Sequence, residues 1–291
     1  MSVPHVFDDA HFLITFSDFD AAMDNFVWSA KPGSDWNDDE LIALNIAVVS
    51  LPPAEFFRTP DPSLKHIDSA ILNSPSPPDV GDLSISDDAI EYLGCLNLAI
   101  ESPQGFLTTF AYKTLGLLGF DKHRAAIIPQ LPIPLTVCGK TDPIQTVSCL
   151  VHTHQQFILL VLVGGEAGAV GLEAWAIAGA IAAFQYNNNK RRDGRFDPLD
   201  AMIIPCITMT GTHPDFYLVP VTASLSNAII IGRRPTTQTR VLHCSTIATH
   251  TQDASVGMED TEYRKLALRR FLAFKELVQK HRALILKGCP D

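Results

Sequence analysis

The sequence predicts an α/β (α+β) fold in which helices flank a mixed central sheet. Apolar runs of strand length alternate with longer segments whose apolar residues recur at helical spacing. Their order along the chain is helix, three strands, helix, a pair of strands and a last helix, which is typical of this fold class. Hydrophobic residues make up 46% of the 291 residues and charged residues 19%. This composition supplies a sizeable core and excludes a wholly disordered chain.

The first 82 residues predict an acidic, proline-rich extension that packs on a domain formed by residues 83–291. Eighteen acidic and three basic residues lie in the first 101 positions, whereas the rest of the chain has 14 acidic and 19 basic residues. Seven prolines fall in residues 52–82, which favours a linker or a surface loop. The acidic part is either an ordinary acidic region or a segment that shields or mimics a partner of the basic part.

Helices are expected at three places before residue 120. The first is capped near Asp35 or Asn37, the second begins near Ser86, and the third begins at Pro103 after Ser102. Gly116 and Gly119 suit the end of the third helix. Apolar spacing predicts the inward faces of the second and third helices as Ile90, Leu93, Asn97 and Ile100, and as Phe106, Phe110, Lys113 and Leu117.

Three strands are expected at residues 133–139, 145–151 and 157–163, the last two forming a hairpin through the turn HTHQQ. A second strand pair is expected at residues 201–209 and 215–222. These runs are rich in β-branched residues and bounded by turn residues, which is the usual pattern of strands.

Two more helices complete the pattern. An alanine-rich helix is expected from Leu172 to Tyr186, followed by a loop with the sequence NNNKRRDGRFDP. The last helix begins near Asp260. Its apolar stripe contains Tyr263, Leu266, Ala267, Phe271, Phe274, Leu277, Val278 and His281.

The segment VGGEAGAVG joins the third strand to the alanine-rich helix, which is where phosphate-binding turns occur. No two of its glycines have the G-x-G spacing of a dinucleotide site, and it has no lysine for a P-loop. Glu166 lies inside the turn and would repel a phosphate. We therefore expect a flexible connection rather than a phosphate site.

Several stretches in order, among them IPLTVCGK, AIAAFQYNN and MIIPCITMTGT, give the chain a resemblance to a family. From about residue 86 onward it resembles a family of fungal intracellular proteins with a PD-(D/E)XK nuclease-like core. The resemblance implies a core of helix, three strands, helix and strand. It also implies metal-assisted phosphodiester hydrolysis, in which two carboxylates hold Mg²⁺ and a lysine helps to position the attacking water.

The chain departs from that family at the residues that carry the chemistry. Val147 stands where the resemblance places the first Asp, Gly165 stands at the second acidic position, and Ala167 stands at the lysine position. Glu166 is one residue out of phase, which on a strand points a side chain to the opposite face. A shift of the alignment would recover Asp142 or Glu166, but no lysine.

A site without these charges suits an uncharged, partly apolar molecule better than a metal or a phosphate. We expect its pocket to contain Val147, Gly165, Glu166, Ala167 and Gln185, the last as a neutral hydrogen-bonding group. We expect no cofactor and no metal ligands.

Other polar residues give weaker hypotheses. His152 and His154 alternate near Cys149 and would suit a metal, although their spacing matches no closed zinc pattern. His213 and Glu166 are the candidates for an acid or base, and His213 is equally an ordinary turn histidine. Asp142 and Asp215 are expected in turns.

Composition and segment lengths limit the partners. Six scattered cysteines without a CxxC pair, and no signal-like or membrane-spanning apolar run, favour an intracellular protein, cytoplasmic or nuclear. The net charge of −10 disfavours general nucleic-acid binding. Three hypotheses remain. The favoured one is a former nuclease fold that binds or transforms a small organic molecule without a metal. The others are a non-catalytic module for protein or nucleic acid, and a surviving metal-dependent nuclease.

Overall fold

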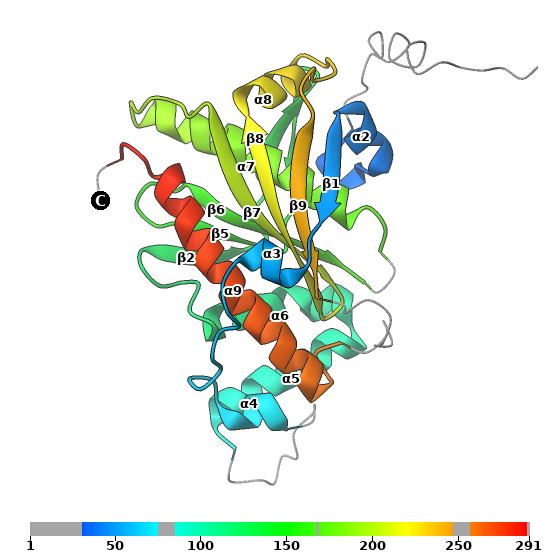
Figure 1. Ribbon diagram of the computed structural model, residues 1–291, viewed down its shortest axis with the longest axis vertical. Coiled ribbons are helices and arrows are strands. Elements are labelled where there is room, and N and C mark those ends of the chain that lie inside the picture. Colours follow the sequence, from blue (N-terminus) through cyan, green and yellow to red (C-terminus); the bar gives the residue numbers. More distant parts are fainter. Residues whose placement is uncertain (1–30, 75–84, 167–168, 247–256, 290–291) are drawn as a thin grey trace, which may run out of the picture.

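The structure, a computed structural model, describes residues 31–74, 85–166, 169–246 and 257–289 (Figure 1). Its centre is a seven-stranded sheet with the order β1-β9-β8-β7-β6-β5-β2. β1 pairs with β9 and β6 with β7 in parallel, and the other neighbours are antiparallel. The predicted α/β fold with a mixed central sheet is therefore confirmed. The strands are β1 Ile46–Ser50, β2 Ala125–Pro129, β5 Ser148–His152, β6 Ile158–Gly165, β7 Ala201–Thr210, β8 His213–Thr222 and β9 Thr239–Ser245.

Helices cover both faces of the sheet. α9 (Thr261–Ile285) crosses the front face in Figure 1, whereas α7 (Leu172–Asp193) lies behind the sheet. α6 (Pro103–Leu117) packs on β2, β5 and β6, and α5 (Asp87–Glu101) packs on α6. The predicted helix starts at Ser86, Pro103 and Asp260 are confirmed, because Ser86, Ser102 and Asp260 are the N-caps of α5, α6 and α9.

The strand predictions are confirmed except at one edge of the sheet. β5 and β6 form the expected hairpin, and β7 pairs with β8. The strand expected at residues 133–139 is β3 (Ile133–Val137), but it forms a separate hairpin with β4 (Lys140–Ile144). The edge place in the central sheet belongs instead to β2. A strand pattern in the sequence does not specify which partner the strand pairs with.

α7 is buried on almost all sides, because the sheet covers one side and the β3–β4 hairpin packs on another. This burial explains why the helix has no polar face over its first three turns. The predicted loop after Tyr186 is wrong up to Asp193, where the helix ends. Asn187 and Asn188 stay in the helix because their amides bind backbone groups of neighbouring segments rather than water.

Each of these two asparagine amides both accepts and donates a hydrogen bond to the backbone of one neighbouring residue. The Asn187 side chain accepts a hydrogen bond from the Ile158 N–H at 2.7 Å and donates one to the Ile158 carbonyl at 2.9 Å. The Asn188 side chain bonds the Leu199 N–H and carbonyl in the same way, at 2.9 and 3.0 Å. Each amide thus takes the place of a strand neighbour for one residue.

The acidic N-terminal region is continuous with the central sheet. After the short turn η1 (Gly33–Asp35), Asn37 caps α2 (Asp38–Ala43) with a capping box, as predicted. β1 then forms an edge of the sheet beside β9. The predicted boundary at residue 82 therefore does not separate the first described residues from the sheet.

The linker or surface loop predicted for residues 52–82 lies outside helices and strands at residues 58–68, but two short helices flank that stretch. These helices are α3 (Pro53–Phe57) and α4 (Ser69–Asn73), and residues 75–82 lie outside the described ranges. Phe56 and Phe57 are buried, and the Phe57 ring meets the Phe216 ring of β8 edge-on at 5.8 Å. Pro52 and Pro53 start the first of these helices, as proline at the first helical position often does.

The buried faces of α5 and α6 include the predicted Leu93 and Phe110 but otherwise differ from those predicted. α5 buries Ala89, Tyr92, Leu93, Leu96 and Ala99, and α6 buries Leu107, Phe110, Ala111, Thr114 and Leu115. Ile100 and Phe106, both predicted to face inward, are exposed. Both helices carry apolar residues on more than one side, so packing between them selects the buried face. The stripe predicted for α9 is confirmed at Tyr263, Ala267, Phe271, Phe274, Val278 and His281.

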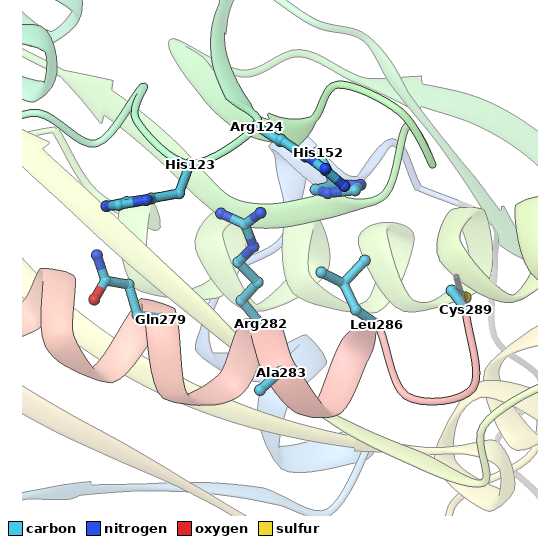
Figure 2. Close-up of a pocket in the computed structure, with 8 residues that line it drawn as sticks. All are labelled: His123, Arg124, His152, Gln279, Arg282, Ala283, Leu286 and Cys289. Carbon is cyan, nitrogen blue, oxygen red and sulfur yellow. The ribbon is translucent and has the colours of Figure 1, made fainter. Parts of the chain in front are cut away.

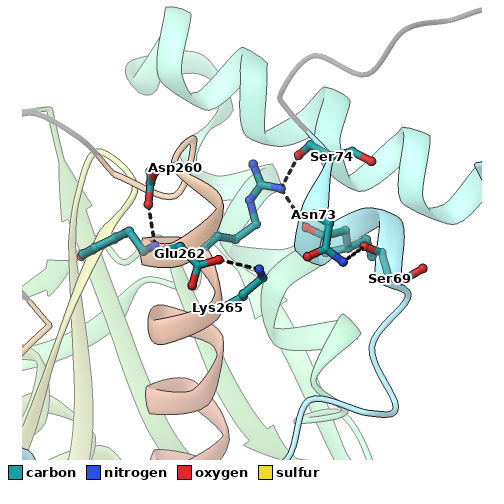
Figure 3. A network of polar contacts seen from close by, with 9 residues as sticks. Ser69, Asn73, Ser74, Asp260, Glu262 and Lys265 are labelled. Atoms are coloured by element: carbon teal, nitrogen blue, oxygen red, sulfur yellow. Dashed lines mark hydrogen bonds and ion pairs between the residues drawn. The ribbon is translucent and has the colours of Figure 1, made fainter.

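Arg264 joins the start of α9 to α4. Its side chain is fully buried and donates to the carbonyls of Ile71, Ser74, Met258 and Glu259, at distances of 2.7 to 3.2 Å. Figure 3 shows this junction, with Ser74 at the end of α4 and Asp260 at the start of α9. The buried guanidinium therefore fixes part of the N-terminal region against the last helix.

Candidate functional site

The start of β5 lies beside the last residues of β6, and the resemblance would place the nuclease chemistry there. The N–H of Val147 donates to the Leu162 carbonyl at 2.9 Å, so Val147, just before β5, lies beside β6 near its carboxyl end. A Cβ atom added to Gly164 would lie 2.7 Å from the Leu107 side chain, 3.0 Å from the Met209 carbonyl oxygen and 3.4 Å from Val147. The glycine therefore permits close packing of apolar side chains at this strand end.

Gly165 has close neighbours on the opposite face. A Cβ atom there would lie 2.8 Å from the Ala169 Cβ and 3.5 Å from Leu172 at the start of α7. The Glu166 side chain is exposed, and its carbonyl accepts from the Ala169 N–H at 3.0 Å. Ala167 lies outside the described residues. The structure thus brings Val147, Gly165 and Glu166 to one end of the sheet, where β6 stops.

Gln185 is elsewhere and has another role. It lies thirteen residues into α7 from Leu172, so about 20 Å of helix separates it from Gly165. Its side chain accepts from the Thr136 N–H at 2.8 Å and donates to the Thr136 carbonyl at 3.3 Å, which fixes β3 to α7. Like Asn187 and Asn188, it replaces a strand neighbour for one residue.

The predicted histidine sites do not converge. His152 is buried and accepts from the Gln155 N–H through Nδ1 at 3.1 Å, whereas His154 is exposed. Cys149 is three residues from His152 on β5 and therefore faces the other side. His213 contacts the Thr210 carbonyl and the Tyr263 ring. Within the described ranges, no group of three or more His, Cys, Asp or Glu side chains is arranged to hold a metal ion.

A polar cluster that the sequence does not predict lies at the same end of the strands. It contains Ser50, Glu173, Asp215, Tyr217 and His243, from β1, α7, β8 and β9. Ser50 and Tyr217 are both register partners of His243, so the three side chains share one face. The carboxyl ends of the parallel strands meet here beside the start of α7, which is where open α/β sheets bind ligands.

The cluster contains a short chain of polar contacts. Ser50 Oγ lies 3.0 Å from His243 Nδ1, within hydrogen-bond distance. His243 Nε2 is buried and lies 3.9 Å from Asp215 Oδ2, too far for a hydrogen bond, and it has no hydrogen-bond partner among the described residues. The Tyr217 ring stacks on the imidazole with 4.6 Å between ring centroids. Asp215 is itself oriented by the Thr246 N–H, which donates to its other oxygen at 3.2 Å. Ser50 is exposed, so the chain has one end in solvent.

Glu173 is the second acid of the cluster. Burial raises the pKa of its carboxyl, and the negative charges of Asp38 and Asp215 act in the same direction, against His243 and a hydrogen bond with Tyr217. Burial also raises the pKa of the Tyr217 phenol, so this group stays a neutral hydrogen-bonding group. A carboxyl with a raised pKa beside an imidazole is a typical acid–base pair.

The sequence held one signal for this cluster. Asp215, which was expected in a turn, lies in β8 and alternates with Tyr217, so the two side chains share one face of the strand. Ser50 and His243 lie far away along the chain, and only strand pairing brings them together.

Comparison of the sequence with protein-family models and with curated proteins finds no match. Among the helices of the described ranges, none has both the length and the apolar character that a bilayer crossing demands.

Proposed function

We propose that this protein has a nuclease-like core without the hydrolytic metal site, and that it binds or transforms a small, largely uncharged organic molecule without a metal. The order α6, β2, β5, β6, α7 and β7 supports such a core, because it is the order of helix, three strands, helix and strand that the resemblance implies. Apolar packing around Gly164 supports the loss of the metal ligands.

The observation that carries the proposal is the contact between Ser50 and His243, whose buried Nε2 faces Asp215 at 3.9 Å, with Glu173 beside the imidazole. His243 accepts a proton from Ser50 or from a ligand hydroxyl, and Asp215 stabilises the imidazolium that results. Glu173 in its protonated form donates to a carbonyl or leaving oxygen of the ligand. The Asp215 carboxylate repels anions, so the ligand of this cluster is neutral or carries hydroxyl and carbonyl groups.

The test is a thermal-shift screen of a metabolite library on the full chain in the presence of EDTA. We expect a compound that stabilises the protein without a divalent metal and loses that effect in His243→Gln and Glu173→Gln. His154→Gln serves as the control, because His154 is an exposed histidine in the turn between β5 and β6, away from the cluster, and its substitution should leave the effect unchanged.

Two results would contradict the proposal. One is a compound that binds equally well to the wild type and to His243→Gln. The other is Mg²⁺-dependent cleavage of plasmid or RNA that disappears in Glu166→Ala, since this outcome would restore a metal-dependent nuclease.

A further inference from the structure

A separate pocket of about 750 Å³ lies at the opposite end of the strands, beside β2 and β5. It is enclosed by the turn before β2, the end of β5 and the last turns of α9. Figure 2 shows His123, Arg124 and His152 on one side and Gln279 and Arg282 on the helix that faces them. Its volume lies in the range of small-molecule sites.

Two arginines contribute positive charge to the wall of the pocket, without a compensating acid. Arg124, Arg282 and the two histidines contribute to its wall, and none of the residues that line it is Asp or Glu. In the described part of the chain, neither arginine forms an ion pair. Burial and the positive charge of Arg124 lower the pKa of Arg282. Since arginine keeps its proton at neutral pH, this repulsion is relieved only by an anion.

The turn that carries two of these side chains is strained. His123 and Arg124 have φ angles of +59° and +62°, and consecutive left-handed residues other than glycine are rare. The turn is held by Thr153, whose N–H and hydroxyl donate to the Arg124 carbonyl at 2.9 and 3.2 Å. Backbone strain of this kind collects at binding sites and ligand clamps.

The facing wall is also fixed. Arg191 of α7 donates to the carbonyls of Ile285 and Lys287 at 3.0 and 2.8 Å, so the last turn of α9 is anchored to the rest of the fold. Within the pocket, the neutral His152 ring carries its hydrogen on Nε2, because Nδ1 accepts from the Gln155 N–H. The backbone of both walls is therefore held in place by contacts within the protein.

We propose that this pocket binds a small phosphorylated molecule, with Arg124 and Arg282 as the main partners of the phosphate oxygens. Two guanidinium forks on opposite walls match the several oxygens of a phosphate better than the two oxygens of one carboxylate. His123 and the Gln279 amide supply further donors, and Leu286 gives the ligand an apolar neighbour. The site is distinct from the Glu173 cluster and does not depend on the function proposed for it.

The experiment is calorimetric titration of the full chain with pyrophosphate at pH 7 and constant ionic strength. We expect binding to the wild type and binding at least about tenfold weaker in Arg282→Gln, as loss of a charge-assisted contact implies. Arg240→Gln is the matched control, because it removes the same charge from β9 at the far side of the sheet and should bind as the wild type does.

A second variant guards against a misfolded mutant. Arg124→Gly removes the guanidinium and also suits the left-handed backbone at this position, so we expect weaker binding with an undiminished melting temperature. The proposal is overturned if pyrophosphate does not bind, or if Arg282→Gln and Arg240→Gln weaken it equally. Citrate that binds as tightly as pyrophosphate, with the same dependence on Arg282, overturns the assignment to phosphate.

Discussion

Gly164 and Gly165 lie in the segment where the sequence places the site, and the structure packs side chains closely against both. They stand at the end of β6, and their neighbours on the two faces of the sheet are Leu107 and Leu172. The resemblance would place a charged side chain at Gly165, and in the structure apolar side chains lie close to both glycines.

A side chain at Gly164 should destabilise the fold. In Gly164→Ala the new Cβ meets Leu107 and the Met209 carbonyl, so we expect the free energy of unfolding to fall by about 1–3 kcal/mol. Urea denaturation measures the difference. In a Leu107→Ala background the same substitution should cost less, since the clashing side chain is gone, and an equal cost in both backgrounds would show that Leu107 is not the cause.

Glu173 should give the folded protein a pH-dependent stability. Its folded-state pKa lies above the ordinary value of about 4.3, so the folded chain binds this proton more tightly than the unfolded chain does. The free energy of unfolding therefore falls as the pH rises from about 4.3 through the raised pKa, and stays lower above it.

Glu173→Gln should remove this contribution. We expect the variant to be more stable than the wild type near pH 7 and to show a smaller decrease in melting temperature between pH 4 and pH 8. Calorimetric melting over this range is the measurement. A wild-type stability that rises with pH in parallel with that of the variant would contradict the raised pKa.

At the scale of elements, α7 is held by the amides of Gln185, Asn187 and Asn188, each of which binds both backbone groups of one neighbouring residue. These contacts connect α7 to β3, to β6 and to the segment before β7. They explain why a helix continues through three asparagines, which the sequence pattern assigned to a loop.

Asn187→Leu should therefore be strongly destabilising. It leaves the buried N–H and carbonyl of Ile158 without their partner, and we expect a loss of about 2–4 kcal/mol in the free energy of unfolding. Asn189→Leu provides the comparison, because Asn189 is exposed on the same helix and should change stability little. Similar losses in chemical denaturation of the two variants would refute the role given to the Asn187 amide.

Arg264 is the corresponding contact between α9 and α4. Arg264→Met keeps the length of the side chain but removes the donors to four buried carbonyls, so we expect a loss of about 3 kcal/mol or more. Proteolysis should then cut more rapidly near α4, whose end is held by this residue. Arg269→Met, on the same helix, should have neither effect.

At the scale of the whole molecule, the acidic N-terminal region and the basic remainder form one sheet. β1 covers the edge of β9, and Phe56 and Phe57 pack against rings on β8 and α9. The composition changes sharply along the chain, but the packing does not follow that change.

A chain that begins at residue 83 should consequently fail to fold. It lacks β1 and both buried phenylalanines, and it exposes the edge of β9, which invites aggregation. We expect insoluble protein or a chain without a cooperative melting transition, whereas a chain that begins at residue 31 should fold. Soluble, cooperatively melting protein from residue 83 onward would support an independent domain after residue 82.

The sequence by itself determined the fold class, the β5–β6 hairpin, the β7–β8 pair and the starts of α2, α5, α6 and α9. These features depend on neighbouring residues, through apolar spacing and capping side chains, and such local preferences are readable along the chain. That Val147 and Gly165 stand at charged positions of the resembling family's pattern stays a prediction.

Only the tertiary structure decided what depends on distant partners. It placed β3 outside the sheet and β1 inside it, set the buried faces of α5 and α6, and gave Gln185 a structural contact. It also assembled Ser50, Glu173, Asp215 and His243 at one end of the sheet, and Arg124 with Arg282 at the other end. These residues are far apart in the chain, so no local pattern connects them, and strand pairing and helix packing alone bring them into contact.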